Sequence, residues 1–156
     1  MDEKRLLKYS IYYLSRFDSS KKNLINILKK KIFNSNINSF EKKELINQIK
    51  KIVLVLEENN LINDSRYCNT KVLSLKRFGK SKNYIINYLL NKGISKQIIQ
   101  TNLNLLLEKD KNWELDSAKL FAKKNKLFDS KTSYEKRLAK MARAGFSYDI
   151  CKKILN

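Results

Sequence analysis

The chain has 156 residues, of which 42% are hydrophobic and 31% charged, a balance typical of a folded protein rather than a disordered one. It has no histidine and no Gly-rich phosphate loop of the G-x-x-x-x-G-K-[ST] or G-x-G-x-x-G type, so we expect no enzyme, no cofactor and no metal site. The net charge of +19 favours a polyanionic partner.

No apolar run approaches the ~18 residues of a membrane-spanning helix, and the residues after Met1 lack the core of a signal peptide. We therefore expect a cytoplasmic protein with no membrane partner. Cys68 and Cys151 lie far apart in the sequence, so we interpret both as small buried residues and not as a disulfide.

Apolar residues recur with helical spacing throughout, and no stretch alternates with a period of two. Proline is absent, and each of the three glycines, Gly79, Gly93 and Gly145, follows an apolar-periodic stretch that it can end at positive φ. These features predict an all-α protein.

In residues 1–60, the segment from Tyr9 to Ile32 predicts a helix, the N-cap Ser20 and a second helix with Leu24 and Leu28 on its apolar face. This segment lacks a hinge glycine. The Asn- and Ser-rich residues 33–42 are interpreted as a loop insertion before a third helix.

In residues 61–107, Asp64 opens a helix over 65–76 and adds negative charge at its positive end. Ser81 is the expected N-cap of the next helix, which contains Ile85 and Leu89. In residues 108–156, Thr132 and Glu135 fit a T-x-x-E capping box.

An internal repeat connects the last two regions. Residues 92–99 and 144–151 share a helix-ending glycine, a large apolar residue, a Ser cap and an apolar pair. We take the chain to be three tandem three-helix repeats, 1–60, 61–107 and 108–156, that form an elongated, curved, solenoid-like rod.

Aromatic side chains can stack on nucleic-acid bases, but those at helical spacing beside aliphatic residues are more typical of a core. We assign Tyr67, Tyr84, Tyr88 and Tyr148 to the core on this ground. Trp113 is the exception to the pattern.

The basic residues are spread evenly, because residues 1–60, 61–110 and 111–156 carry net charges of +6, +6 and +7. A run of charge is usually only a solvated face. Here, however, clusters recur around the junction of the first and second helices of successive units, where they would align into a stripe. The residues that we predict to bind the partner are Lys21, Lys22, Lys29, Lys30, Lys31, Lys76, Arg77, Lys80, Lys82, Lys123, Lys124, Lys126, Arg137, Lys140 and Arg143.

Four segments, in order over residues 9–155, resemble the RecX family. They are Tyr13-Leu14-Ser15-Arg16 with Ser20-Lys21-Lys22-Asn23-Leu24, then Leu61-Ile62-Asn63-Asp64-Ser65-Arg66-Tyr67-Cys68, then Lys92-Gly93-Ile94, and finally Gly145-Phe146-Ser147-Tyr148 with Ile150. The chain departs from the family pattern in the missing first hinge glycine, in Asn23 for the usual Glu, and in Lys82 for a frequent proline.

The resemblance implies a regulator of homologous recombination and the SOS response that binds the RecA filament and inhibits its ATPase and strand exchange. It also implies contact with single-stranded DNA, and we expect a monomer. Asp64, Arg66 and Tyr67, with Gly93 and Gly145, are interpreted as a structural signature, in which the first three fix a helix start against its neighbour.

Several alternatives stay open. A nonspecific binder of single-stranded DNA or RNA shares the charge pattern, and the Gly93 and Gly145 turns superficially fit a helix-turn-helix regulator. A membrane-surface protein and a carboxylate-metal nuclease are weaker alternatives; the nuclease would reveal itself by cleavage that depends on Mg²⁺.

Overall fold

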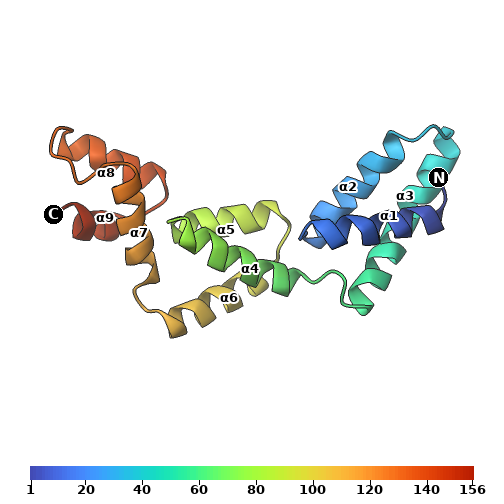
Figure 1. Cartoon of the computed structure of the whole chain (residues 1–156), viewed down its shortest axis with the longest axis horizontal. Helices are drawn as coiled ribbons and strands as arrows, with labels where there is room; N and C mark the ends of the chain where they lie inside the picture. Colours follow the sequence, from blue (N-terminus) through green and yellow to red (C-terminus); the bar gives the residue numbers. More distant parts are fainter. The chain divides into compact units, whose positions relative to one another are not determined.

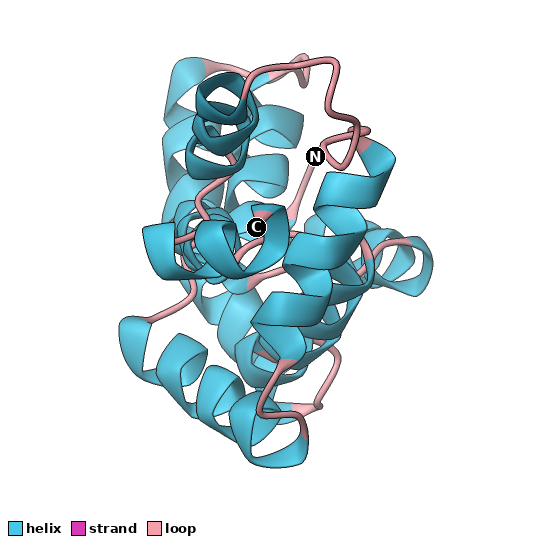
Figure 2. Cartoon of the chain, turned by 90° about the vertical axis from the view of Figure 1, so that its left-hand side faces the viewer, coloured by secondary structure: helices cyan, strands magenta, loops and turns pink.

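The computed structural model describes all 156 residues and contains only helices and loops (Figure 2). The all-α prediction is therefore confirmed. Figure 1 labels the helices in chain order: α1 Glu3–Arg16, α2 Lys21–Phe33, α3 Ser39–Glu58, α4 Asp64–Arg77, α5 Lys82–Asn91, α6 Lys96–Lys109, α7 Trp113–Lys124, α8 Tyr134–Arg143 and α9 Tyr148–Leu155.

None of these helices combines the length and the apolar character needed to cross a bilayer. The chain divides into two compact units. Unit 1 consists of Met1–Tyr67 with Lys92–Ile94, and unit 2 of Cys68–Asn91 with Ser95–Asn156. Three sets of three helices are compatible with the predicted repeats, but the repeat boundaries and the curved rod stay predictions.

In unit 1, α3 packs against both α1 and α2 (Figure 1). The three helices bury one apolar stripe each, which is what stabilises helices of this length. Their shared core consists of Leu6, Leu24, Leu28, Ile32, Leu45, Ile49, Ile52, Val53, Leu56 and Ile62.

The predicted loop over 33–42 is too long. The structure has a loop only from Asn34 to Asn38, because Asn38 and Glu41 form a capping box that starts α3 at Ser39. The Asn38 side chain accepts the Glu41 N–H at 2.9 Å, and the Glu41 carboxylate accepts the Asn38 N–H at 3.1 Å. The density of Asn and Ser suggested a loop, whereas one of these asparagines is the helix cap.

In unit 2, α9 packs against both α7 and α8. The core of this bundle consists of Ala118, Ala122, Leu127, Met141, Phe146, Cys151 and Ile154. Both cysteines are buried and unbonded to each other, as predicted. Burial also raises the pKa of the Cys151 thiol, which keeps it in its unreactive protonated form.

Two of the aromatic assignments are wrong. Tyr84 is 40% and Tyr148 59% exposed, whereas Trp113, the exception in the sequence, is only 3% exposed. Tyr67 is buried, as predicted, and Tyr88 is partly buried. Both exposed tyrosines lie in the first turns of short helices, where spacing relative to aliphatic residues is a weak guide to the buried face.

The predicted caps at Ser20 and Ser81 are confirmed. Their hydroxyls accept the N–H of Asn23 at 3.2 Å and of Tyr84 at 3.1 Å. The box at Thr132 is wrong by one residue: Ser133 caps α8 by accepting the Lys136 N–H.

The three glycines have positive φ, as expected: 76° at Gly79, 78° at Gly93 and 96° at Gly145. At the last two, a close approach also requires glycine. A Cβ on Gly93 would lie 2.4 Å from the Lys22 side chain, and one on Gly145 would lie 2.5 Å from the Ser81 hydroxyl.

These close approaches belong to a helix junction that occurs twice. The Ser20 hydroxyl, in unit 1, donates to the carbonyl of Lys92 at 2.6 Å, directly before Gly93. The Ser81 hydroxyl, in unit 2, donates to the carbonyl of Ala144 at 2.7 Å, directly before Gly145. Both serines are fully buried, so each hydroxyl satisfies a helix N-terminus and the end of a distant helix together.

An acidic residue completes each junction. Asp64 accepts the N–H of Lys21, the first residue of α2, at 2.8 Å, and Glu114 accepts the N–H of Lys82, the first residue of α5. The same three contacts thus occur at two places in the chain, which is compatible with the predicted repeats.

We expect Ser20→Ala and Ser81→Ala each to lower the free energy of unfolding by about 2 kcal/mol. Each change removes an N-cap and also leaves a distant carbonyl unpaired. Ser133→Ala is the matched control, because Ser133 is exposed and caps only its own helix, so that its loss costs about 1 kcal/mol or less. Urea unfolding followed by circular dichroism measures all three; equal losses would contradict the proposed double role.

Glu114 makes the contribution of the second junction to folding stability dependent on pH. Burial raises the pKa of the Glu114 carboxyl, while the Lys82 N–H and the Lys82 charge act in the opposite direction. A carboxyl with a raised pKa in the folded state contributes stability below its unfolded pKa, and this contribution is lost as pH rises through the folded pKa.

Glu114→Gln should therefore stabilise the protein at neutral pH. The amide oxygen still accepts the Lys82 N–H, but no charge has to be desolvated. The gain over the wild type should grow as pH rises from about 4 to 7. Urea unfolding of both proteins at several pH values tests this, and a gain that shrinks with pH would contradict it.

Candidate basic interface

A groove in unit 2 runs along α8 beside the loop that joins α7 to α8. The loop residues 125–133 form one wall and the outer face of α8 the other. Six of the lining residues are basic and one is acidic: Lys126, Lys131, Lys136, Arg137, Lys140, Arg143 and Asp129.

The cations come from one helix face and from the loop opposite. Lys136, Lys140 and Arg143 follow the i, i+4, i+7 spacing that places side chains on one face of a helix. All three are exposed. The Asp129 carboxylate accepts the backbone N–H of Lys131 at 3.0 Å, so its charge is held in the turn of its own loop. The groove therefore presents mainly positive charge.

Arg137 holds the two walls together. Its guanidinium donates to the carbonyl of Leu127 at 3.0 Å and to that of Thr132 at 3.1 Å. Leu127 is itself buried in the core of the bundle, and the preceding Lys126 has a positive φ of 55°. Arg137 is one of the residues predicted to bind the partner, and these contacts show that it also positions the loop.

The other predicted basic residues have different surroundings. Lys21 pairs with Glu57 at 3.0 Å and Lys76 with Asp110 at 3.1 Å. Such pairs reduce the charge that the two lysines offer to a partner.

Three further lysines lie over aromatic rings. The ammonium groups of Lys31, Lys80 and Lys124 lie 4.7, 4.6 and 5.6 Å from the ring centroids of Tyr9, Tyr84 and Phe78. Each remains at the surface with its charge oriented by a ring. Outside the groove, the predicted residues with exposed side chains and none of these ion or ring pairs are Lys22, Lys29, Lys30, Arg77, Lys82 and Lys123. The charge of Lys82 acts on the Glu114 carboxyl.

Of the predicted residues, only Lys126, Arg137, Lys140 and Arg143 share the groove. Sequence reasoning missed Lys131 and Lys136. The spacing of Lys136 relative to Lys140 and Arg143 was a usable signal, whereas Lys131 lies in a loop whose path no sequence pattern fixes. The alignment of all clusters into one stripe stays a prediction.

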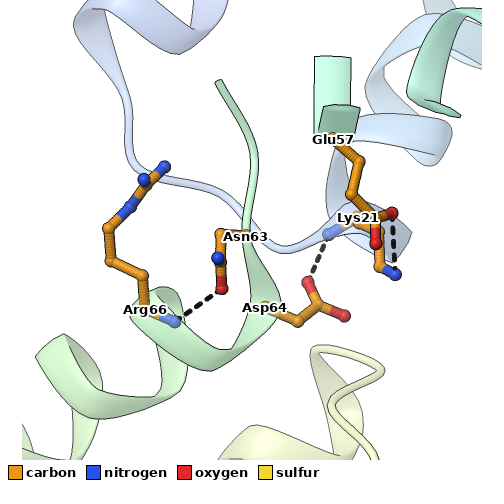
Figure 3. Close-up of polar contacts among 5 residues, drawn as sticks. All are labelled: Lys21, Glu57, Asn63, Asp64 and Arg66. Carbon is orange, nitrogen blue, oxygen red and sulfur yellow. Dashed lines mark hydrogen bonds and ion pairs between the residues drawn. The ribbon is translucent and has the colours of Figure 1, made fainter. Parts of the chain in front are cut away.

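Two of the signature residues, Asp64 and Arg66, lie at the first helix junction (Figure 3). Asn63 caps α4 by accepting the Arg66 N–H at 2.9 Å, which leaves the Asp64 carboxylate for the start of α2. The Arg66 guanidinium donates to the carbonyl of Asn60 at 3.2 Å, at the turn before α4. Lys21 contributes its backbone N–H to Asp64 and its ammonium group to Glu57, from the end of α3.

The arrangement of the cysteine and carboxylate side chains bears on whether the chain could hold a metal ion. No three cysteine or carboxylate side chains come together in an arrangement that would hold a metal ion. The groove therefore offers attraction for a polyanion, without a group of metal ligands beside it.

Comparison with known proteins gives one consistent set of relatives. No model of a protein family matches the chain. The chain is 28% identical to the regulatory protein RecX of Myxococcus xanthus over 155 residues, which cover 94% of this chain and 82% of that protein.

Two further relatives have the same name. The chain is 36% identical to the regulatory protein RecX of Clostridioides difficile over 118 residues, and 32% identical to that of Lactococcus lactis over 109 residues. The matches cover 70% and 66% of this chain, but only 53% and 40% of those two proteins. The chain thus spans about half or less of the length of these two relatives.

Solved structures agree on the fold. The crystal structure of RecX from Lactobacillus salivarius matches with a TM-score of 0.65 and 22% identity, over 97% of this chain and 93% of that one. A crystal structure of a regulatory protein RecX matches with a TM-score of 0.75 and 20% identity, over 97% of this chain and 70% of that one. These structures show the shared fold. The sequence matches to the regulatory proteins RecX, together with the resemblance of four ordered segments, show that the chain belongs to the RecX family.

Proposed function

We propose that this chain is a non-enzymatic regulator of homologous recombination and the SOS response, which binds the RecA nucleoprotein filament and inhibits its ATPase and strand exchange. Its relatives are named as regulatory proteins, which supports a regulatory role and agrees with the expectation that the chain is not an enzyme. The observation that carries the proposal is the basic groove along α8, with six cations and one carboxylate.

The groove is suited to an extended anionic surface. Several cations fixed on one helix and one pinned loop raise the local potential, which draws a polyanion in quickly and orients it. In a nucleoprotein filament, that surface is DNA phosphate, acidic protein side chains, or both. Shape and the contacts around the groove then decide which filament is bound.

Single-stranded DNA is the second partner that we propose, and it underlies the alternative function, nonspecific binding of single-stranded DNA or RNA. The same groove favours this alternative, because cations that fit a filament also attract free phosphate chains. The two functions differ in stoichiometry. A filament regulator acts at few copies per filament, whereas a DNA competitor must cover the DNA.

We expect this protein to lower the single-strand-dependent ATPase of its cognate RecA at well below one copy per RecA subunit, in excess DNA and at fixed salt. Competition for DNA has no such effect at these ratios, because most of the DNA remains uncovered. The readout is the steady-state rate of ATP hydrolysis over a titration. Inhibition only at amounts that saturate the DNA would favour the nonspecific binder instead.

A double charge reversal tests the groove itself. Lys136→Glu with Lys140→Glu should raise the concentration for half-maximal inhibition by about tenfold or more, since it replaces attraction by repulsion on the exposed face of α8. The effect should shrink as salt is added, because exposed charges are screened.

Lys43→Glu with Lys50→Glu is the matched control, with the same change of net charge on exposed positions of α3. The control should move the half-maximal concentration much less. If both variants lose inhibition equally, net charge and not the α8 groove determines binding.

A further inference from the structure

A second groove of unit 2 lies along α5, next to the turn between α8 and α9. The side chains that matter here are Tyr84, Asn87, Tyr88 and Asn91 of α5, together with Arg143 at the end of α8. No carboxylate lines this groove. It combines aromatic rings, amides and one guanidinium. A site that binds only phosphate groups requires cations but neither rings nor amides.

The first element of the site is an exposed aromatic platform. Tyr84 is 40% exposed, its ring is nearly parallel to that of Tyr88 at 19°, and the ring centroids are 6.5 Å apart. Lys80 places its ammonium group 4.6 Å from the centroid of the Tyr84 ring. Single-strand binders stack bases on exposed rings and use nearby cations to attract the phosphate. Because the Lys80 ammonium lies over a face of the Tyr84 ring, a base that stacks on that face displaces it toward the phosphate.

The second element is a row of amides. Asn83, Asn87 and Asn91 follow each other at intervals of four along α5, on one helix face. Asn83 donates to the carbonyl of Gly145 at 3.1 Å, which fixes the turn against α5. Asn87 and Asn91 are exposed in the groove, and a carboxamide offers both donors and an acceptor to the edge of a base.

The third element connects this groove to the basic one. Arg143 lines both grooves, so the phosphate-attracting face of α8 continues into the Tyr84 platform. A strand whose phosphates follow Lys136, Lys140 and Arg143 would reach α5 with its next nucleotide. A double helix would not present a base there, since its bases are stacked inside.

We propose that the α5 groove binds an unpaired base of single-stranded nucleic acid. The base stacks on Tyr84, its edge meets the amide of Asn87, and the adjoining phosphate lies on Arg143. The proposal goes beyond regulation of the recombinase, because it assigns a base-contacting site that works with no recombinase present.

The test compares two strands with the same phosphates. Binding of a fluorescently labelled oligothymidylate of about 12 nucleotides is measured by anisotropy, together with an abasic strand of equal length. Tyr84→Leu removes the ring but keeps an apolar helix former. It should weaken binding of the oligothymidylate by about tenfold and leave the abasic strand within about twofold of the wild type.

Two controls separate stacking from other effects. Tyr84→Phe keeps the ring and should bind both strands like the wild type. Tyr12→Leu removes another exposed tyrosine that has a cation over its ring, Arg16 at 4.9 Å in unit 1, and should change neither affinity.

The proposal is overturned if Tyr84→Leu binds oligothymidylate like the wild type, or if it weakens both strands equally. The second result would mean a loss of phosphate contact or of local structure. Because no recombinase is present in this assay, either failure leaves the ATPase titration as an independent test of the regulatory role.

Discussion

The fold depends on a buried serine hydroxyl that serves two helices. Ser20 and Ser81 each cap one helix and donate to a carbonyl more than sixty residues further along the chain. Short helices are marginal alone, so their ends have to be satisfied where they meet. The glycine after each carbonyl is required because a Cβ would lie 2.4 Å from the Lys22 side chain at Gly93 and 2.5 Å from the Ser81 hydroxyl at Gly145.

The basic groove is a product of the same packing. Ser81 donates to the carbonyl of Ala144 and Asn83 to that of Gly145, so the turn that ends α8 is fixed against α5. Arg137 then ties the loop to α8, so the exposed lysines of loop and helix face one another. Arg137, which positions the loop, thus lies on the same helix as the exposed Lys136, Lys140 and Arg143, and the pattern of charge in the sequence does not distinguish it from them.

Sequence patterns predicted what depends on local chemistry: the helical class, the caps at Ser20 and Ser81, and the glycine turns. They did not predict the surroundings of residues whose contacts come from distant parts of the chain. Asp64 lies in the first turn of α4, as predicted, but its carboxylate also accepts the N–H of Lys21 at the start of α2, and Asn63 is the residue that caps α4. Tyr84 was assigned to the core by its spacing, but Ile85 and Leu89 form the buried face of this helix and Tyr84 lies outside it. Lys131 lines the groove because tertiary contacts determine the path of its loop, and the sequence does not predict that path.

The excess of cations has a consequence for the folded state itself. With 34 basic and 15 acidic residues, at least 19 cations have no acidic residue left with which to pair. Their mutual repulsion opposes compaction, and a bound polyanion relieves it. Ligands that bind only the folded chain also raise its stability by mass action. We therefore expect the folded protein to be least stable in dilute salt with no polyanion bound.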